Sequence, residues 1–280
     1  MKSHATETMI LQGLPVEESP EVFKTLESAP GVYDVVRVIH GAPLFLEDHL
    51  NRIRRSAELS VLSIQVPEHS VIEKSLSLLI GLLGPGTYSI KLIFMEGGKN
   101  CYAMARVPRR LPSQADYRQG VSTHLFHLSR NHPQIKEIDR HYSQTVQREI
   151  DEDRVFEVLL VDENLRITEG SKSNIFFIRG ETLITPPAKE VLPGITRGKV
   201  LYLSRQGGLS VEEKDVFVSD LPNFDAAFLT GTSIFILPVA RINDLSFPSA
   251  DHPTIQKVTR AYAALTEEYL ASYACHDNPD

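Results

Sequence analysis

The stretch VLPGITRGKV, residues 191–200, places a Pro-Gly turn directly before a predicted helix. Gly194 stands where a capping side chain would be, and no acidic side chain follows it in the first turn. The first N–H groups of a helix have no acceptor inside the helix and carry the positive end of its dipole. The sequence therefore predicts an anion site at Ile195 and Thr196. The alternative is an ordinary turn, with Thr196 as a capping hydroxyl.

A second stretch of this kind is LTGTSIFILPV, residues 229–239. Its run Thr230-Gly231-Thr232-Ser233 follows a predicted strand and offers consecutive N–H groups and three hydroxyls, which can enclose an anion. The alternative is a strand-to-helix turn whose hydroxyls bond locally. No phosphate loop with Gly-Lys-Ser/Thr is present, and no Gly-x-Gly-x-x-Gly follows a strand. A nucleotide-binding Rossmann domain is therefore not expected.

The composition of the 280 residues is that of an ordinary globular enzyme, with 42% hydrophobic and 23% charged residues. The formal net charge of -7, without a block of Lys and Arg, argues against binding to nucleic acid. No apolar segment is long enough to span a membrane. The two cysteines have no metal-ligand spacing, so we expect no metal site and a reducing, cytoplasmic location.

The pattern of strands and helices predicts two domains of mixed α+β class. Residues 1–110 are expected to form a smaller N-terminal α/β domain and residues 121–280 a larger C-terminal domain, joined by a linker at 111–120 within the proline-rich and polar stretch PRRLPSQADYRQG. In the first domain, strands are predicted around a turn at 41–43 and at 87–95 and 101–107, and helices at 47–59 and 71–83. The second domain is predicted to combine strands at 121–128, within 155–187, at 209–213 and at 226–232 with helices at 139–150, 196–206 and 254–269.

Three charged residues outside these turns have unremarkable surroundings when each is taken alone. Lys136 lies in NHPQIKEIDRHYSQ, where a solvated surface lysine is the ordinary expectation. Glu169 lies in ITEGSKSN between a strand and a turn, and Arg52 lies on the polar face of the helix at 47–59. Their order along the chain, together with the two turns, is more specific than any of them alone.

That order resembles the fold-type IV pyridoxal phosphate enzymes, which include branched-chain aminotransferases, D-amino-acid aminotransferases and aminodeoxychorismate lyases. The resemblance extends from Gly31 to Asn243, over most of the chain. It rests on EDHLNRI, the lysine of IKEIDRHYS, ITEGSKSNIFFI, LITPP followed by VLPGITRGKV, and AAFLTGTS. It implies the two-domain fold of D-amino-acid aminotransferase, pyridoxal 5'-phosphate as cofactor, and a homodimer.

The resemblance also implies a role for each matched residue. Lys136 would bind the cofactor aldehyde covalently and then move a proton, in a ping-pong aldimine mechanism between an amino acid and a 2-oxo acid. Glu169 would keep the pyridine nitrogen protonated, so that the ring accepts electrons from the substrate Cα. The remaining cofactor contacts would come from Arg52, the N–H groups of Ile195 and Thr196 and the Thr232 hydroxyl on the phosphate, and from Leu192 on a ring face.

The chain departs from the family pattern at several positions. Arg140, His141 and Tyr142 stand where relatives carry Asn-Tyr or Asn-Leu, and of these Tyr142 is favoured over His141 as the contact to the phenolic oxygen. Lys172 stands where relatives often carry Ser or Gly, which makes it a second candidate for the covalent lysine. Before Gly31, LESAPG replaces a Tyr/Phe-Gly-Asp-Gly run at the substrate side.

The substrate is less clearly implied than the cofactor. Tyr33, Lys91, Thr232 and Ser233 are the predicted substrate-binding residues, with Lys91 suited to a carboxylate. We favour an aminotransferase with a branched-chain-like substrate. The alternatives are a D-amino-acid aminotransferase or an aminodeoxychorismate lyase on the same scaffold and, more remotely, a phosphate-ligand-binding protein without catalysis.

Overall fold

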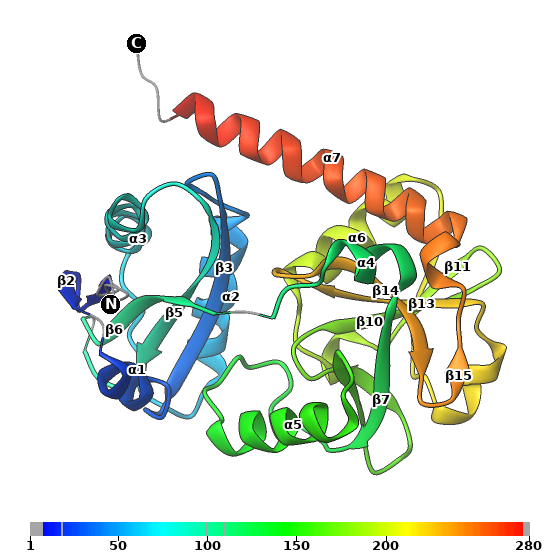
Figure 1. The fold of residues 1–280 in the computed structure, drawn as a ribbon. Coiled ribbons are helices and arrows are strands. Elements are labelled where there is room, and N and C mark those ends of the chain that lie inside the picture. The colour runs from blue at the N-terminus through cyan, green and yellow to red at the C-terminus, as the bar shows by residue number, and fades with distance from the viewer. Residues whose placement is uncertain (1–7, 18, 99, 109, 277–280) are drawn as a thin grey trace, which may run out of the picture. The chain divides into compact units, whose positions relative to one another are not determined.

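The computed structural model describes residues 8–17, 19–98, 100–108 and 110–276, and it divides into two compact units (Figure 1). The first unit consists of the described residues of Met1–Arg109, Ile135–Arg140 and Glu268–Asp280, and the second of Arg110–Gln134 and His141–Glu267. Each unit contains one β-sheet with helices, so the predicted mixed α+β class is confirmed.

The first unit is built on a six-stranded antiparallel sheet with the strand order β2-β1-β6-β5-β3-β4. The long strand β3 pairs with β5 over its whole length, from Gly31 opposite Met95 to Ile39 opposite Thr87. The strands are β1 (Thr8–Leu11), β2 (Leu14–Glu17), β3 (Gly31–Ile39), β4 (Ala42–Pro43), β5 (Thr87–Met95) and β6 (Tyr102–Val107).

Helices cover both faces of this sheet. The helices α2 (Leu46–Leu59) and α3 (His69–Leu83) pack on Val32, Val36 and Val38 of β3, and Figure 1 shows α2 directly behind that strand. The short helix α1 (Pro20–Leu26) packs with Tyr33 on the opposite face. Because side chains alternate along a strand, β3 directs Asp34 towards α2 and Tyr33 to the other side.

Two distant segments complete the first unit. Residues 135–140 are bound to β3, since the Tyr33 N–H donates to the Lys136 carbonyl oxygen at 2.9 Å and the Ile138 N–H donates to the Gly31 carbonyl oxygen at 2.9 Å. The C-terminal part of α7 (Pro253–His276) contributes Tyr269, whose hydroxyl accepts the Leu46 N–H at the start of α2 at 3.2 Å. This contact caps the helix that carries Arg52.

The second unit is built on a nine-stranded mixed sheet with the order β12-β11-β10-β13-β14-β7-β8-β9, and β15 pairs with β14. The pairs β11–β12, β14–β7 and β7–β8 are parallel, and the other pairs are antiparallel. The strands are β7 (Val121–His127), β8 (Glu157–Val161), β9 (Ile167–Gly170), β10 (Asn174–Arg179), β11 (Thr182–Thr185), β12 (Ser210–Glu213), β13 (Ala226–Gly231), β14 (Phe235–Ile242) and β15 (Leu245–Ser246).

The alternation of side chains in the central strands of this sheet separates the core of the unit from the two turns predicted to bind an anion, at 194–196 and 230–233. Ile175 and Phe177 of β10 belong to the main core of the unit, so Asn174 and Phe176 point to the other face. There the Phe176 ring stacks on that of Phe228, with centroids 5.0 Å apart. The helical elements are α4 (Gln114–Gln119), α5 (Arg140–Asp153), η1 (Ala188–Glu190), α6 (Ile195–Gln206), η2 (Val218–Asn223), η3 (Ser249–Asp251) and the first part of α7.

The structure differs from the sequence-based expectation in the segments between these elements. Residues 111–120 contain α4, which is closed by a capping box between Ser113 and Asp116, and the Tyr117 hydroxyl donates to the Ile234 carbonyl oxygen at 3.0 Å. These residues therefore belong to the second unit. Ala42 and Pro43 form the short strand β4, so the turn before it lies at His40–Gly41, where both φ angles are positive.

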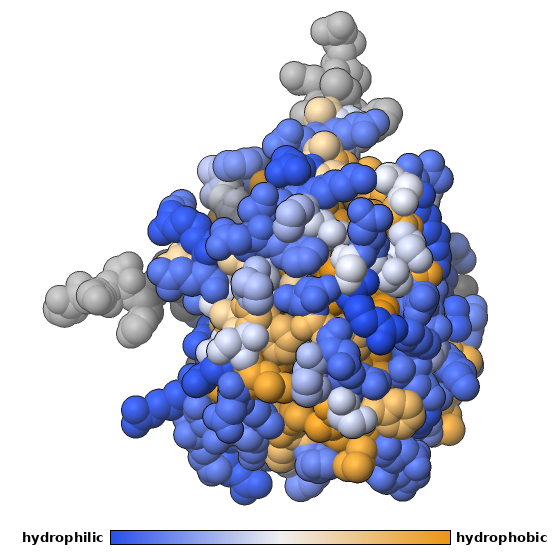
Figure 2. Space-filling model, turned by 90° about the vertical axis from the view of Figure 1, so that its right-hand side faces the viewer, coloured by the Kyte–Doolittle hydropathy of each residue, from blue (hydrophilic) through white to orange (hydrophobic). Residues whose placement is uncertain are grey.

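No helix within the described residues is long and apolar enough to pass through a bilayer. Figure 2 shows one face of the molecule, where apolar side chains gather near the centre among hydrophilic ones. Cys101 is a free thiol, and the side chain of Cys275 lies outside the described part of the chain.

Candidate functional site

Arg52 forms a buried ion pair with Asp34 inside the first unit. Its Nε and Nη2 donate to the two carboxylate oxygens at 2.8 and 2.6 Å, Asp34 is 0% exposed, and the Arg52 side chain is 9% exposed. Burial alone would raise the pKa of Asp34, but the charges and hydrogen bonds of Arg52 and His49 hold it well below its ordinary value. Asp34 thus binds one edge of a planar, five-donor guanidinium and sets the plane in which it can bind another anion.

His49 is the third member of this buried group. Its Nδ1 lies 3.0 Å from Asp34 Oδ1, and because an ionised carboxylate only accepts, Nδ1 carries the proton. Burial lowers the pKa of His49, although Asp34 opposes this effect, so the ring is neutral. Among the described residues its Nε2 has no hydrogen-bond partner. Sequence analysis missed Asp34 and His49; the signal was the three-residue spacing of His49 and Arg52 on one face of α2.

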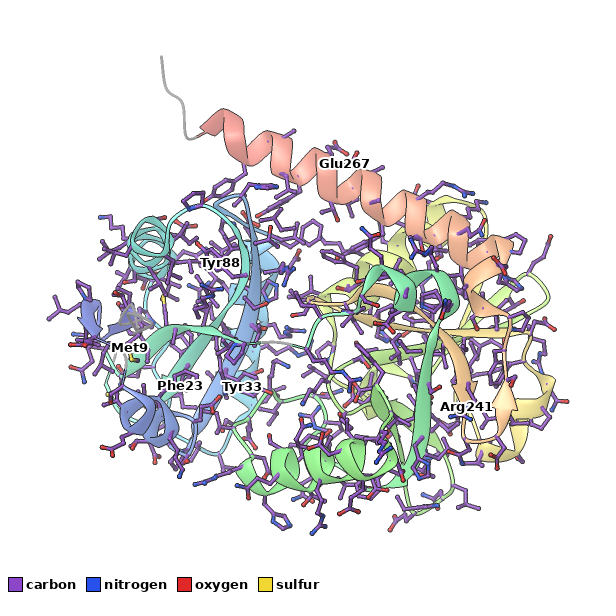
Figure 3. All side chains as sticks on the ribbon, in the orientation of Figure 1. Met9, Phe23, Tyr33, Tyr88, Arg241 and Glu267 are labelled. Carbon is purple, nitrogen blue, oxygen red and sulfur yellow. The ribbon has the colours of Figure 1, made fainter. Side chains whose placement is uncertain are left out.

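Lys136 is held by its backbone next to Tyr33. Its N–H donates to the Ser56 hydroxyl at 3.2 Å, and its Nζ lies 4.8 Å from the centroid of the Tyr33 ring. Lys91 Nζ lies 4.6 Å from the same centroid and also donates to Glu27 Oε1 at 2.9 Å. Figure 3 labels Tyr33 on β3, between the elements that carry the two lysines. The first unit thus brings both predicted lysines to one aromatic ring.

Glu169 is a buried carboxylate of the second unit, 3% exposed, at the end of β9. Arg130 Nη1 donates to its Oε1 at 2.9 Å, while Asn174 Nδ2 and the Leu192 N–H donate to its Oε2 at 3.1 and 3.0 Å. Asn174 Nδ2 also donates to the Leu192 carbonyl oxygen at 3.0 Å. These donors fix the direction of the carboxylate and place Leu192 beside it.

Arg130 links Glu169 to Tyr142. The Arg130 guanidinium carbon lies 5.8 Å from the centroid of the Tyr142 ring, and the Tyr142 hydroxyl donates to the Ser171 carbonyl oxygen at 3.0 Å. His141, the alternative to Tyr142, is exposed. Sequence analysis missed Arg130, which lies in a polar stretch without periodicity.

The start of α6 has the features predicted from the sequence. Gly194 precedes it without a side-chain cap, and its first turn contains no acidic residue. A Cβ atom at Gly194 would lie 2.0 Å from Asn174 Oδ1, so a larger residue would displace the amide that binds Glu169 and the Leu192 carbonyl oxygen. Thr196 is buried, with its Oγ1 3.4 Å from the Tyr262 hydroxyl, and burial raises the pKa of Tyr262 to about 12, which keeps it protonated.

The second predicted turn, at the end of β13, lies on the same side of the sheet. Thr230 pairs with Asn174, and its buried Oγ1 has no hydrogen-bond partner among the described residues. Thr232 and Ser233 are half-buried in the turn that follows. The Phe235 ring after this turn lies 6.0 Å from that of Tyr262. Tyr262 therefore contacts both the start of α6 and the segment after the second turn.

The turn between Glu169 and Asn174 is held by another buried carboxylate, Glu157 on β8. It accepts hydrogen bonds from the Ser171 hydroxyl, from the Ser173 hydroxyl at 3.3 Å and from the Lys172 N–H at 3.3 Å. Burial raises the pKa of Glu157 despite these donors. The Lys172 side chain is exposed, and its Nζ donates to Gln147 Oε1 at 3.1 Å.

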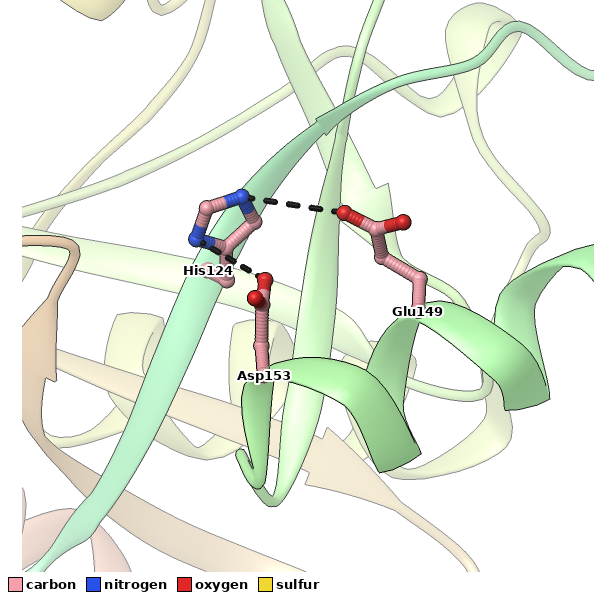
Figure 4. A group of neighbouring side chains, drawn as sticks. All are labelled: His124, Glu149 and Asp153. Atoms are coloured by element: carbon pink, nitrogen blue, oxygen red, sulfur yellow. Dashed lines mark ion pairs between the residues drawn. The ribbon is translucent and has the colours of Figure 1, made fainter.

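A separate cluster in the second unit joins His124 of β7 to Glu149 and Asp153 of α5 (Figure 4). Nδ1 of His124 lies 3.3 Å from Asp153 Oδ2, and its Nε2 lies 3.8 Å from Glu149 Oε1. The two carboxylates thus face different ring nitrogens, whose lone pairs diverge. This arrangement suits ion pairing with a protonated imidazole.

The predicted residues are divided between the units. Arg52, Lys136, Tyr33 and Lys91 lie in the first unit, and Tyr142, Glu169, Leu192, Ile195, Thr196, Thr232 and Ser233 lie in the second. In the second unit the structure brings together Glu169, Leu192 and the start of α6 through Asn174.

Comparison with known proteins identifies the family. Residues 31–242 match the model of the family described as amino-transferase class IV. The D-alanine aminotransferase of Bacillus licheniformis is 26% identical over 252 residues, covering 82% of this chain and 86% of the relative. The "Probable branched-chain-amino-acid aminotransferase" of Thermotoga maritima is 30% identical over 237 residues, covering 80% of this chain and 81% of the relative.

The fold is also that of solved structures in this family. The branched-chain aminotransferase of Thermoproteus uzoniensis with norvaline superposes with a TM-score of 0.76 at 24% identity, covering 95% of this chain and 98% of that chain. The predicted two-domain fold type is thereby confirmed. Since the family model covers most of the chain, this protein belongs to the class IV aminotransferases, a family of pyridoxal phosphate-dependent enzymes.

Proposed function

We propose that this protein transfers an amino group between an amino acid with a branched-chain-like side chain and a 2-oxo acid, in two half-reactions on pyridoxal phosphate. The observation that carries the proposal is the buried Glu169 carboxylate, which three donors orient. Burial of a carboxylate is unfavourable unless donors or cations bind it, so a buried and oriented carboxylate is suited to bind a protonated ring nitrogen.

The second unit fits the cofactor at its anionic end as well. Three features of the start of α6 support a phosphate site. The N–H groups at Ile195 and Thr196 have no side-chain cap, the first turn contains no acidic residue, and there is little space for a side chain at Gly194. Thr230 Oγ1, for which the described residues provide no hydrogen-bond partner, adds a hydroxyl on the same face of the sheet. In the first unit, Arg52 would bind a phosphate oxygen, with Asp34 setting the plane of its guanidinium.

Pyridoxal phosphate, when bound, supplies an electrophilic carbon and a ring that accepts electrons from the substrate Cα. The chain's own contribution is to hold and move protons. The Lys136 amine is suited to take the proton from the substrate Cα and return it, which contributes about 10²–10⁴ in rate. Glu169 would hold the proton on the ring nitrogen, and Tyr142 would contact the phenolic oxygen. Lys91 is the proposed cation for the substrate carboxylate.

The names of the relatives favour a branched-chain substrate, but they describe more than one activity. Relatives named as branched-chain-amino-acid aminotransferases include that of Thermotoga maritima, while others are named D-alanine aminotransferase and aminodeoxychorismate lyase. A lyase would release pyruvate without needing a 2-oxo acid, which separates the two activities experimentally.

Half-reactions with single amino acids test the proposal. Protein loaded with pyridoxal phosphate is mixed with L- or D-amino acids while the visible absorption of the cofactor is followed. We expect L-valine, L-leucine or L-isoleucine to convert the cofactor stoichiometrically to its amino form, and a 2-oxo acid to reverse the change. Conversion by D-amino acids alone, or pyruvate release from aminodeoxychorismate, would favour the alternatives.

We also propose a homodimer, which the family resemblance supports. Light scattering at micromolar protein concentration measures the mass directly. A mass near 31.3 kDa in fully active protein would contradict the proposal.

A further inference from the structure

Two lysines of the first unit contact the same tyrosine ring, and one of them, Lys91, also forms an ion pair with Glu27. Lys136 and Lys91 place their Nζ atoms 4.8 and 4.6 Å from the Tyr33 centroid, so the two ammonium groups are separated by no more than the sum of these distances. Glu27 Oε1 lies 2.9 Å from Lys91 Nζ. The Glu27 carboxylate therefore lies next to the ammonium group that shares the Tyr33 ring with the proposed reactive amine.

Lys91 is largely buried, and Glu27 is an anion that pairs with it. Its side chain is 11% exposed, on the central strand β5, and burial of an ammonium group without an anion is unfavourable. Glu27 is the C-cap residue of α1, and its side chain is 43% exposed. The anion is thus the more accessible member of the pair, and it can be displaced or bypassed by another carboxylate.

We propose that Glu27 is a specificity-determining residue that competes with the substrate carboxylate for Lys91. The inference rests on the proposed function, in which Lys91 binds that carboxylate. An ammonium group has three donors, one of which points to Glu27, so a substrate carboxylate binds a cation whose charge is already largely neutralised. With Glu27 present, the site favours substrates whose affinity comes mainly from an apolar side chain.

The first test is the kinetic effect of Glu27→Gln, with Glu21→Gln as the matched control. Glu21 lies on the same short helix, is exposed and forms no ion pair among the described residues. Glu27→Gln is expected to lower KM for the 2-oxo acid about three- to tenfold, with kcat nearly unchanged, because the carboxylate contact is the same in ground and transition states. Lys91→Met is expected to raise KM, and in the double variant the effect of Glu27→Gln should vanish.

The second test is spectroscopic and does not require turnover. The pH midpoint of the cofactor's visible absorption reports the protonation of the nitrogen of Lys136. Glu27→Gln leaves the Lys91 cation uncompensated, which disfavours the protonated form and lowers the midpoint by roughly half a unit to one unit. Lys91→Met leaves the Glu27 anion uncompensated and is expected to raise it. Because these shifts arise from charge alone, they test whether the pair lies close enough to Lys136 to act on it, while the KM values test the competition for the substrate carboxylate.

The outcomes separate the two proposals. If wild-type protein shows no cofactor absorption that depends on Lys136, the proposed function fails, and this inference with it. If wild type performs both half-reactions but Glu27→Gln matches Glu21→Gln in KM and midpoint, the inference alone is overturned. Shifts of the same sign in Glu27→Gln and Lys91→Met also overturn it.

Discussion

The two units hold their buried charges in opposite ways. In the first unit two of the groups with proposed functions, Arg52 and Lys91, are cations that acidic side chains hold. In the second unit the charged group with a proposed function is an acid, Glu169, and an arginine, an amide and a backbone N–H hold it. A buried charge is tolerated only when it is paired and hydrogen-bonded. Each unit therefore orients its own functional groups through contacts made within that unit.

The largest expected effect is the loss of the Lys136 amine, the group proposed to bind the cofactor and to move the proton. Lys136→Ala should lower the transamination rate by at least about 10²–10⁴, since both covalent attachment and proton transfer are lost. Mass spectrometry after borohydride reduction should find the cofactor on residue 136 in wild type and on no residue in the variant. Lys172→Ala is the matched control, and an adduct on Lys172 in wild type would contradict the assignment.

Asp34→Asn tests whether the first unit depends on its buried ion pair for stability. Removing one member of such a pair typically costs about 3–5 kcal/mol, because the remaining charge stays buried. The pKa of Asp34 is depressed on folding, so its contribution is present above the unfolded value of 3.8 and is lost as pH falls through the folded value. Urea unfolding at pH 7 should show the deficit, with Glu73→Gln on α3 as an exposed control.

Equal stability of Asp34→Asn and Glu73→Gln at pH 7 would show that the pair is dispensable. The deficit should also narrow under strongly acidic conditions, because wild type then loses the charge as well.

Glu169→Gln applies the same logic to the second unit, where the effect should appear in the chemistry. The amide keeps the shape of the side chain but cannot keep a ring nitrogen protonated, so kcat should fall on the order of 10²-fold while the cofactor still binds. Stopped-flow measurement of the first half-reaction checks this, with the exposed Glu163→Gln as control. An unchanged half-reaction rate would exclude Glu169 as the partner of the ring nitrogen.

The smallest effect concerns Glu157, which holds the turn next to Glu169. Burial raises the pKa of Glu157 on folding. The free energy of unfolding of the wild type therefore falls as pH rises from the unfolded pKa of 4.5 through the folded pKa. The free energy of unfolding of Glu157→Gln relative to wild type should therefore rise across that window, by about 1.4 kcal/mol for each unit of pKa shift. Glu181→Gln, on an exposed turn, should show no such trend in urea titrations from pH 4 to 8.

The sequence predicted the parts of this fold that have strong periodicity or clear end signals. Four elements lie within a few residues of their expected positions, namely α2, α3, β5 and β6. The helix α6 was expected at 196–206 and begins one residue earlier, at Ile195. The segment 111–120 was interpreted as a linker because it lacks apolar periodicity, although the Ser113-x-x-Asp116 spacing is a capping-box signal that could have indicated α4. The strand β14 was missed because Thr230–Ser233 also fits a strand-to-helix turn.

Residues that act through others were the ones that sequence analysis missed. Arg130 and Glu157 lie outside the stretches that carry the resemblance, and Asn174 lies within one of them without a predicted role. Their contacts appear only when the fold brings them to Glu169 or to its turn. Asp34 was missed because it lies in a strand, at a position where the alternation of side chains predicts a residue of the apolar core. The side chains that orient a site are thus harder to predict than those proposed to perform its chemistry.

The edge-on contact between Asp34 and Arg52 has a consequence for protein engineering. A lysine at position 52 could neutralise the carboxylate, but it has no second planar edge, so it could not present a forked donor pair to a further anion. Shortening or removing the acid would release the arginine to rotate. Libraries that randomise these two positions separately should therefore recover few active clones, and productive solutions should arise from changing them together.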